Sequence, residues 1–270
     1  MSGLPAAAPS PSLDDWLAAL HASQRQLTGT VGRLTDRALA TTSFASQWSC
    51  AQVLSHLGSG AEIFSNLLQA GLHGEEMPGG ELFAAIWSRW DALGPREQAT
   101  RAIRANDDLL AALSGLGPAA RAMWRLPLYG VPGDLSYLVF LRLGEHAVHV
   151  WDIEVVHDDR ALVCAPAVRV LATRLHETAT RVAKPPAAPL NIVVTTQQPD
   201  RRYRIAATPS GVEVTASDSE SEPGLPVAGE PVVMAAETWL RLVYGRLRAD
   251  DEVHAAPDVL RQLVRLFPGF

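Results

Sequence analysis

The chain has 270 residues, of which 47% are hydrophobic and 19% are charged, so it can bury a sizeable core and does not have the composition of a disordered protein. Its 23 Lys and Arg residues are outnumbered by 29 Asp and Glu residues, which gives a formal net charge of −6. Because no basic cluster offsets this balance, we do not expect a nucleic-acid partner. The length fits one large domain or two modest ones.

The cysteine content and the start of the chain bear on its compartment. Cys50 and Cys164 are far apart and form neither a disulfide framework nor a CxxC redox motif. The opening run MSGLPAAAPSPS lacks the basic and apolar regions of a signal peptide. A run of about eighteen apolar residues, the length needed to span a membrane, is also missing. We therefore expect a cytoplasmic protein with no membrane partner.

Helical periodicity extends from Ser12 to about residue 182. Ser12 and Asp15 predict a capped first helix, and a Ser49–Gln52 capping box predicts the start of a second one. Further helical segments follow around residues 83–90 and 96–113, and Asp134 introduces a long helix that extends to roughly residue 157. Four or five long helices with short connections predict an up-and-down bundle.

The pattern changes after the run KPPAAP at residues 184–189, which cannot be helical and predicts a linker. Beyond it, strand-like runs occur at residues 191–196, 203–206 and 212–215, and helices are predicted at 235–245 and 257–267. We therefore expect an α+β protein with two domains, a four-helix bundle over residues 1–183 and a small α+β domain over residues 184–270.

The long helix carries the most informative polar pattern. Glu145 and His149 are four residues apart and therefore project from one helical face, which Arg142 and Asp152 extend in both directions. Apolar residues bracket this group, and the opposite face is apolar. Metal sites in the cores of helical bundles are built in this way. The alternative is a solvated face on which the four charged or polar side chains form a ladder.

A zinc site with an exchangeable position usually has three protein ligands. The best candidate for the third is His56, which falls at the margin of the apolar stripe of the second helix, next to Leu57 and near Val53. The alternative is a histidine at the edge of the core, satisfied by local hydrogen bonds.

Two motifs resemble those of a known family. The segments Trp48-Ser49-x-x-x-Val53-Leu54-x-His56-Leu57 and Glu145-His146-x-x-His149-x-Trp151-Asp152 are similar to the two signatures of the mycothiol-dependent maleylpyruvate isomerase family. That family belongs to the DinB-like, metal-binding four-helix bundles, and the resemblance covers about the first 180 residues. The segment Glu237-Thr238-Trp239-Leu240-x-Leu242-x-x-Gly245-Arg246 is similar to the family's second domain, an α+β module likened to sterol carrier proteins.

The resemblance implies a divalent metal, usually zinc, held by His56, Glu145 and His149, with mycothiol as the thiol cosubstrate. It also implies that an arginine of the second domain faces the active site, and Arg246 is the position that matches; the alternative for Arg246 is a solvated residue after a helix-ending glycine.

Three further residues are expected to surround the bound groups. His146 is turned about 100° from Glu145 and is placed behind the ligands, whereas Trp48 and Asp152 are expected to orient them. A purely structural role is the alternative for Trp48 and Asp152.

A metal with two histidines, one glutamate and an open position can bind a thiol and stabilise its thiolate, which then attacks an electrophilic small molecule. If the adduct is kept, the outcome is S-conjugation or thiol transfer; if it is eliminated after bond rotation, the outcome is cis–trans isomerisation of the maleylpyruvate type. Arg246 would anchor a substrate carboxylate or stabilise an enolate, with Arg241 and Arg248 as the next candidates.

Other readings remain open at this point. Cys50 lies in the first turn of the second helix, where the helix N-terminus can lower a thiol pKa, but no base partner is evident. The bundle could instead be a non-catalytic module that binds metal or a small thiol for sensing. A metal-assisted hydrolase is a further alternative, but the sequence lacks the HExxH motif, which argues against it.

Overall fold

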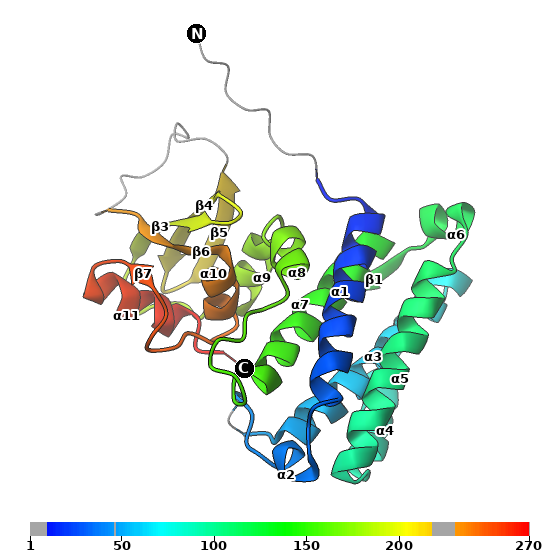
Figure 1. The fold of residues 1–270 in the computed structure, drawn as a ribbon. Coiled ribbons are helices and arrows are strands. Elements are labelled where there is room, and N and C mark those ends of the chain that lie inside the picture. The colour runs from blue at the N-terminus through cyan, green and yellow to red at the C-terminus, as the bar shows by residue number, and fades with distance from the viewer. Residues whose placement is uncertain (1–9, 46, 218–229, 270) are drawn as a thin grey trace. The chain divides into compact units, whose positions relative to one another are not determined.

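The structure is a computed structural model that describes residues 10–45, 47–217 and 230–269 (Figure 1). The chain divides into two compact units, one formed by Ser12–Ala167 and the other by the residues from Val168 onward. The boundary expected from the sequence, at residues 183–184, lies about two short helices later than this division. Among the helices that the structure describes, none is long and apolar enough to cross a membrane.

Four long helices form the first unit. They are α1 (Leu13–Val31), α3 (Cys50–His73), α5 (Pro95–Ser114) and α7 (Leu135–Glu154). Both predicted capping boxes are present, Ser12 with Asp15 at the start of α1 and Ser49 with Gln52 at the start of α3. Shorter elements connect them, namely α2 (Asp36–Leu39), α4 (Gly80–Asp91), α6 (Pro118–Met123) and a hairpin of β1 (Leu126–Leu128) and β2 (Val131–Gly133).

Helices that follow one another along the chain are not always neighbours in the bundle. Helix α1 packs against α5 and α7, and α3 packs against the same two helices. Helices α1 and α7 are parallel, as their contacts show: Trp16 with Phe140, Ser23 with His146 and Thr30 with Glu154. A parallel arrangement of neighbours requires a long connection somewhere, and α4 lies in the connection between α3 and α5.

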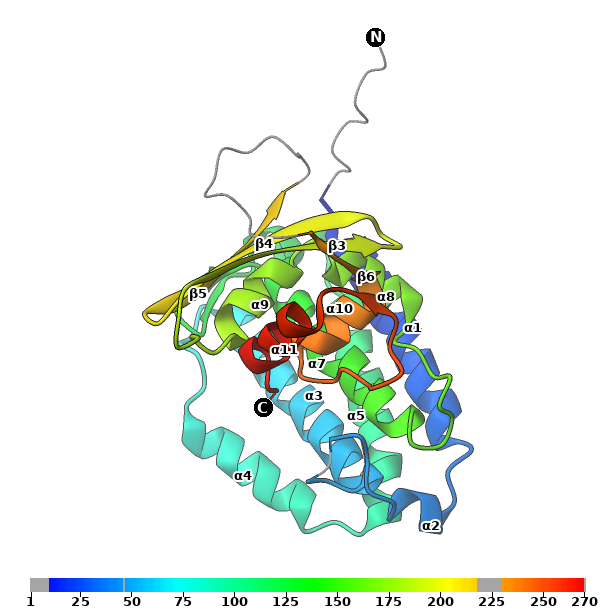
Figure 2. The same cartoon turned by 90° about the vertical axis from the view of Figure 1, so that its left-hand side faces the viewer.

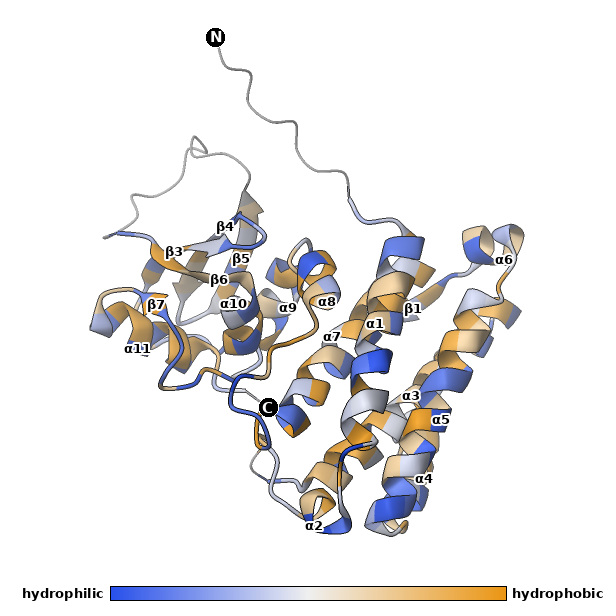
Figure 3. Cartoon of the chain, in the orientation of Figure 1, coloured by the Kyte–Doolittle hydropathy of each residue, from blue (hydrophilic) through white to orange (hydrophobic). Residues whose placement is uncertain are grey.

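Helix α7 is buried on nearly all sides, including its polar residues Arg142, His146 and Asp152. In contrast, α5 carries both hydrophobic and hydrophilic residues along its length (Figure 3). A helix apolar around most of its circumference belongs in a core. The polar side chains of α7 must therefore find partners inside the bundle.

The second unit is a five-stranded sheet with helices. The strands are β3 (Leu190–Gln197), β4 (Arg201–Thr208), β5 (Gly211–Ser217), β6 (Val232–Ala235) and β7 (Val253–His254), in the order β5-β4-β3-β6-β7. Strands β3 and β6 are parallel and the other pairs antiparallel. Helices α9 (Leu175–Val182), α10 (Ala236–Val243) and α11 (Pro257–Leu266) lie on one face of the sheet (Figure 2).

Helix α9 is tied to this sheet directly: the Thr180 hydroxyl accepts a hydrogen bond from the backbone N–H of Val214 at 2.9 Å. The Tyr203 hydroxyl donates to the carbonyl of Ala172, just after α8 (Ala165–Leu171), at 2.7 Å. These bonds explain why the units separate before α9. The predicted α+β class and three of the strands are confirmed, whereas β6 and β7 were not predicted because they are short.

Candidate metal centre

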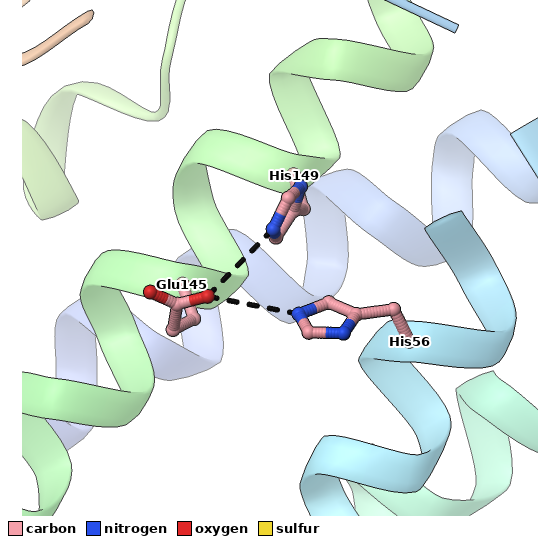
Figure 4. A group of neighbouring side chains, drawn as sticks. All are labelled: His56, Glu145 and His149. Atoms are coloured by element: carbon pink, nitrogen blue, oxygen red, sulfur yellow. Dashed lines mark ion pairs between the residues drawn. The ribbon is translucent and has the colours of Figure 1, made fainter. Parts of the chain in front are cut away.

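Three side chains of the first unit converge from two helices (Figure 4). His56 Nε2, on α3, lies 3.6 Å from Glu145 Oε2 on α7. His149 Nε2, one turn further along α7, lies 3.7 Å from the same oxygen. One potential ligand atom from each residue lies within 4.8 Å of the other two. The structure therefore brings together the three residues that the sequence analysis named as metal ligands.

Local structure accounts for this convergence. The cap at Ser49 starts α3 so that His56 falls two turns into the helix, and α3 is antiparallel to α7. Helical spacing then places Glu145 and His149 on the same side. The alternative of a solvated face is wrong, because Arg142, His149 and Asp152 are respectively 1%, 8% and 0% exposed.

The donor set fits a divalent metal ion. Ligand atoms around a tetrahedral zinc at about 2.0–2.2 Å lie about 3.3–3.5 Å apart, close to the two separations from Glu145 Oε2 to the His56 and His149 nitrogens. Two imidazoles and a carboxylate are also a ligand set found in catalytic zinc sites. The site has room for a ligand from solvent, since the side chains of His56 and Glu145 are 32% and 40% exposed.

Asp152 orients one of the histidines. Its Oδ2 lies 2.8 Å from Nδ1 of His149, and its side chain is fully buried. Because a carboxylate only accepts hydrogen bonds, Nδ1 carries the hydrogen and Nε2 is left as the electron-pair donor. The orienting role expected of Asp152 requires such a hydrogen bond, and the role itself stays a prediction.

The three side chains also shift one another's pKa. Burial opposes protonation of His149, but its hydrogen bonds to Asp152 and Glu145 outweigh burial and raise its pKa. Burial alone would raise the pKa of Glu145, yet the hydrogen bonds from His149 and His56 hold it well below its usual range. Burial lowers the pKa of His56. Glu145 is thus a carboxylate and His56 a neutral imidazole near pH 7, the forms that bind a metal.

A known protein family matches the part of the chain that holds these three residues. The sequence profile of the mycothiol maleylpyruvate isomerase N-terminal domain matches residues 20–154, half of the chain. The chain belongs to this family. The match includes all three residues of the metal-ligand group, and it confirms the predicted family and the prediction that the chain is an enzyme.

Solved structures support the fold. The crystal structure of the mycothiol-dependent maleylpyruvate isomerase superposes with a TM-score of 0.66 at 16% sequence identity, covering 92% of this chain and 95% of that chain. A histidine-to-alanine mutant of the mycothiol-dependent maleylpyruvate isomerase gives the same TM-score and coverage at 15% identity. At these identities the likeness establishes the fold over both units. No curated protein matches the chain.

Within this family member, a buried arginine lies one turn from Glu145. Arg142 Nη2 donates to the carbonyl of Leu57 at 2.7 Å and to Asn106 Oδ1 at 2.6 Å. A Cβ atom on Gly60 would lie 2.7 Å from Arg142 Nη1, so the glycine makes room for the guanidinium. The arginine thereby joins α7 to α3 and α5 one turn before Glu145, whose negative charge favours the ionised guanidinium.

Of two other residues predicted to surround the site, one lies beside it and the other does not. Trp48 lies beside it, with its ring centre 5.1 Å from that of His56 and 6.0 Å from that of His149. His146 does not join the group: its Nδ1 lies 2.8 Å from Ser23 Oγ, and its Nε2 lies 3.2 Å from Gln24 Oε1, both on α1. Burial holds the pKa of His146 well below its usual range.

Cys50 does not have the lowered thiol pKa that its place at the start of α3 suggested. It is fully buried, and burial raises its pKa to about 11. Its Sγ lies 3.7 Å from His157 Nε2. Loss of solvation thus outweighs the helix N-terminus, and the thiol is protonated near pH 7.

The three candidate arginines of the second unit have partners within that unit. Arg246 is 7% exposed, and its Nη1 donates to the carbonyl of Tyr244. Arg241 forms ion pairs with two carboxylates: its Nε lies 2.8 Å from Glu237 Oε1, and its Nη2 lies 2.6 Å from Asp251 Oδ1. These pairs give Arg241 a structural role. Arg248 pairs with Asp250 at 2.6 Å. The placement of Arg246 at the active site stays a prediction.

The sequence analysis did not identify the hydrogen-bond partners of His146 and Arg142. Ser23 and Gln24 bind His146, and Asn106 binds Arg142. A signal for them existed, because each occupies a position where the apolar stripe of its own helix continues. Polar residues at such positions predict buried partners on a neighbouring helix.

Proposed function

We propose that this chain is an enzyme that activates a small thiol, mycothiol, for attack on an electrophilic substrate, with a divalent metal, most readily zinc, held by His56, Glu145 and His149. The observation that carries the proposal is the convergence of these three donors, with His149 fixed by Asp152, in a member of the maleylpyruvate isomerase family.

A bound metal would supply positive charge that stabilises a thiolate at neutral pH. The chain's own residues prepare the site for it. Asp152 holds a hydrogen on Nδ1 of His149, so that Nε2 is the nitrogen left to bind an ion, and the hydrogen bonds around Glu145 keep its carboxylate ionised. The guanidinium of Arg142 is engaged by the carbonyl oxygen of Leu57 and the amide oxygen of Asn106.

The reaction begins when the thiol sulfur forms a bond to an electron-poor carbon of the substrate. If that bond is kept, the product is an S-conjugate or the result of thiol transfer. If rotation about the former double bond precedes cleavage of the same carbon–sulfur bond, the product is the cis–trans isomer and the thiol is regenerated. Arg246 would bind a substrate carboxylate during this sequence. Family membership favours isomerisation.

The test measures metal content and turnover together. We expect about one zinc per chain in protein purified without chelator, thiol-dependent isomerisation of maleylpyruvate, and loss of both in Glu145→Ala. The control is Glu97→Ala, which removes an exposed carboxylate on α5 that pairs with Arg101. Stoichiometric zinc retained in Glu145→Ala would overturn the ligand assignment.

Other outcomes would point to other classes. Zinc and thiol bound without turnover, with either maleylpyruvate or a chlorobimane as electrophile, would identify a binding or sensing module. Thiol-independent hydrolysis would identify a hydrolase. The geometry disfavours the latter, because the carboxylate of Asp152 is engaged by His149 and that of Glu145 belongs to the donor set, which leaves neither to act as a general base.

A further inference from the structure

His56 comes from a different helix than the other two members of the metal-ligand group (Figure 4). Glu145 and His149 are both on α7, so helical spacing sets their separation. The position of His56 relative to them depends on how far α3 slides along α7 and how it is turned about its own axis. Arg142, one turn before Glu145, contacts α3 immediately after His56.

Arg142 contacts one stripe of α3 in three places. Its Nη2 donates to the carbonyl of Leu57, the residue after His56, at 2.7 Å. A Cβ atom on Gly60 would lie 2.7 Å from its Nη1, so a side chain there would displace the guanidinium. Its guanidinium carbon lies 5.7 Å from the centre of the Phe64 ring, within the range of a cation–π contact. Positions 57, 60 and 64 share one face of a helix, so these contacts fix both the slide and the rotation of α3.

A third helix holds the guanidinium at this place. Asn106 on α5 accepts a hydrogen bond from Arg142 Nη2 at 2.6 Å, and its own Nδ2 donates to the carbonyl of Ala102 at 2.9 Å. Arg142 and Asn106 are 1% and 3% exposed. The guanidinium is therefore held between α5 on one side and α3 on the other.

Stability alone does not account for a buried arginine of this kind. The two acceptors of its Nη2 are neutral, a carbonyl and an amide, and its Nε is buried without a hydrogen-bond partner. Burial lowers the pKa of the Arg142 guanidinium to about 10, although the charge of Glu145 opposes this shift. Apolar residues of similar size are often as stable as a buried charge. The arginine is better explained by the position that it gives to a neighbouring residue.

We propose that Arg142 is a positioning residue: by holding the carbonyl of Leu57 it fixes the position of His56 in the metal-ligand group. The consequence for metal binding rests on the proposed function, whereas the position itself does not. Two successive contacts join the antiparallel helices, Arg142 with Leu57 and then Glu145 with His56. A shift of α3 by one residue would move it by about 1.5 Å and turn it by about 100°, so His56 would no longer face Glu145.

The test removes this contact without leaving a buried polar group unpaired. Arg142→Met combined with Asn106→Leu replaces both buried polar side chains by apolar ones, and we expect this double variant to be about as stable as the wild type. Its zinc Kd, measured by competition with a chelator on the full chain, should nevertheless rise about tenfold or more. Gly60→Ala, which keeps both polar side chains and displaces only the guanidinium, should also raise the zinc Kd.

The matched control is a contact of the same kind further along α3. Trp124 Nε1 donates to the carbonyl of Leu68 at 2.8 Å, and a Cβ atom on Gly71 would lie 2.2 Å from the Trp124 ring. Leu68 lies about 18 Å from His56 along the helix. Trp124→Phe removes this hydrogen bond, so it should lower the free energy of unfolding and leave the zinc Kd unchanged. Stability and zinc affinity thus change separately, which a purely structural role of Arg142 does not predict.

A second measurement needs no metal. The ring centres of His56 and His149 lie 4.7 Å apart, close enough for a nuclear Overhauser effect between their ring protons in histidine-labelled protein. We expect this signal in the metal-free wild type and in Trp124→Phe. We expect its loss in the double variant, because α3 is then free to slide and turn.

The outcomes separate this proposal from the proposed function. A wild type that binds no zinc but whose ring–ring signal disappears in the double variant would overturn the metal site and support the positioning role. Unchanged zinc Kd and ring–ring signal in the double variant and in Gly60→Ala would overturn the positioning role and leave the metal site in place. An equal loss of zinc affinity in Trp124→Phe would overturn it as well. Circular dichroism checks folding, and Gly60→Ala decides the question if the double variant does not fold.

Discussion

His149 and Asp152 are joined by a 2.8 Å hydrogen bond between the imidazole Nδ1 and the carboxylate Oδ2, three residues apart on α7. The carboxylate is fully buried and the imidazole nearly so. A buried charge of this kind needs a partner, and the donor that it finds is a proposed metal ligand. The pair sets the tautomer of His149 and the direction of its Nε2 before any ion is bound.

Replacing Asp152 by Asn should therefore weaken zinc binding without unfolding the bundle. The asparagine keeps the size of the side chain but lacks the negative charge that holds a hydrogen on Nδ1 of His149. Loss of such a partner lowers metal affinity by about 10- to 100-fold. Zinc Kd values measured by competition with a chelator check this. Asp108→Asn, an exposed carboxylate on α5, is the control, and equal affinity in all three proteins would contradict the role of Asp152.

Arg246→Ala should lower kcat/KM for a carboxylate-bearing electrophile by about tenfold or more, since a charged hydrogen bond to substrate is lost. Zinc content should stay at the wild-type level, because the proposed ligands lie in the other unit. Arg261→Ala removes an exposed cation on α11 that pairs with Asp258 and serves as the control. Wild-type activity in Arg246→Ala would transfer the anchoring role to another residue.

Local patterns in the sequence predicted local structure well. The caps at Ser12 and Ser49 and the pairing of Glu145 with His149 depend only on residues three or four positions apart, so the helices and one face of the site followed directly. The rotation along the helix predicted that His146 lies off that face, but the residue was still expected to surround the bound groups, and it contacts α1 instead. Its partners on α1 could not be predicted, because they depend on which helix packs on that side.

Contacts between different helices could not be predicted from periodicity alone. That His56 meets Glu145 depends on α3 lying antiparallel to α7, which no spacing in either helix specifies; the family resemblance supplied it. The parallel pairing of α1 with α7 depends on the long connection through α4. The close approach of α4 to α3, with Trp90 on Gly58, was missed because its signal in sequence is a single glycine.

Cys50 should be dispensable. With a pKa of about 11, its thiol is about 0.1% ionised at pH 8, and its side chain is fully buried. Cys50→Ala should keep thiol-dependent turnover, and iodoacetamide at that pH should modify the partly exposed Cys164 first, as peptide mass spectrometry would show. Rapid inactivation with the label on Cys50 would contradict this and point to a protein nucleophile.

His146 should make the bundle sensitive to acid. As the pH falls through about 6.5, the unfolded chain binds a proton at His146, whereas the folded chain does not, because burial holds that pKa well below its usual range. The stability that the neutral ring contributes is therefore present above about pH 6.5 and is lost as the pH falls further, by at most about 1.4 kcal/mol per pH unit.

The measurement is the free energy of unfolding of metal-free protein at about pH 7.5 and 5.5, for the wild type and for His146→Gln. Other histidines titrate in both proteins, so the difference between them reports on His146. We expect the wild type to lose more stability over this interval than the variant. An equal loss would show that His146 is protonated in the folded bundle.

The close approach of α4 to α3 predicts that two glycine substitutions differ in their effect on stability. Gly58→Ala would place a Cβ atom 2.1 Å from the buried Trp90 ring, so that the indole or α4 must move; we expect a loss of about 1–3 kcal/mol. Gly80→Ala, at the first residue of α4, meets no atom within 4 Å and should change stability by no more than about 0.5 kcal/mol. Urea unfolding measures both. Equal stability of the two variants would mean that Trp90 does not rest on Gly58.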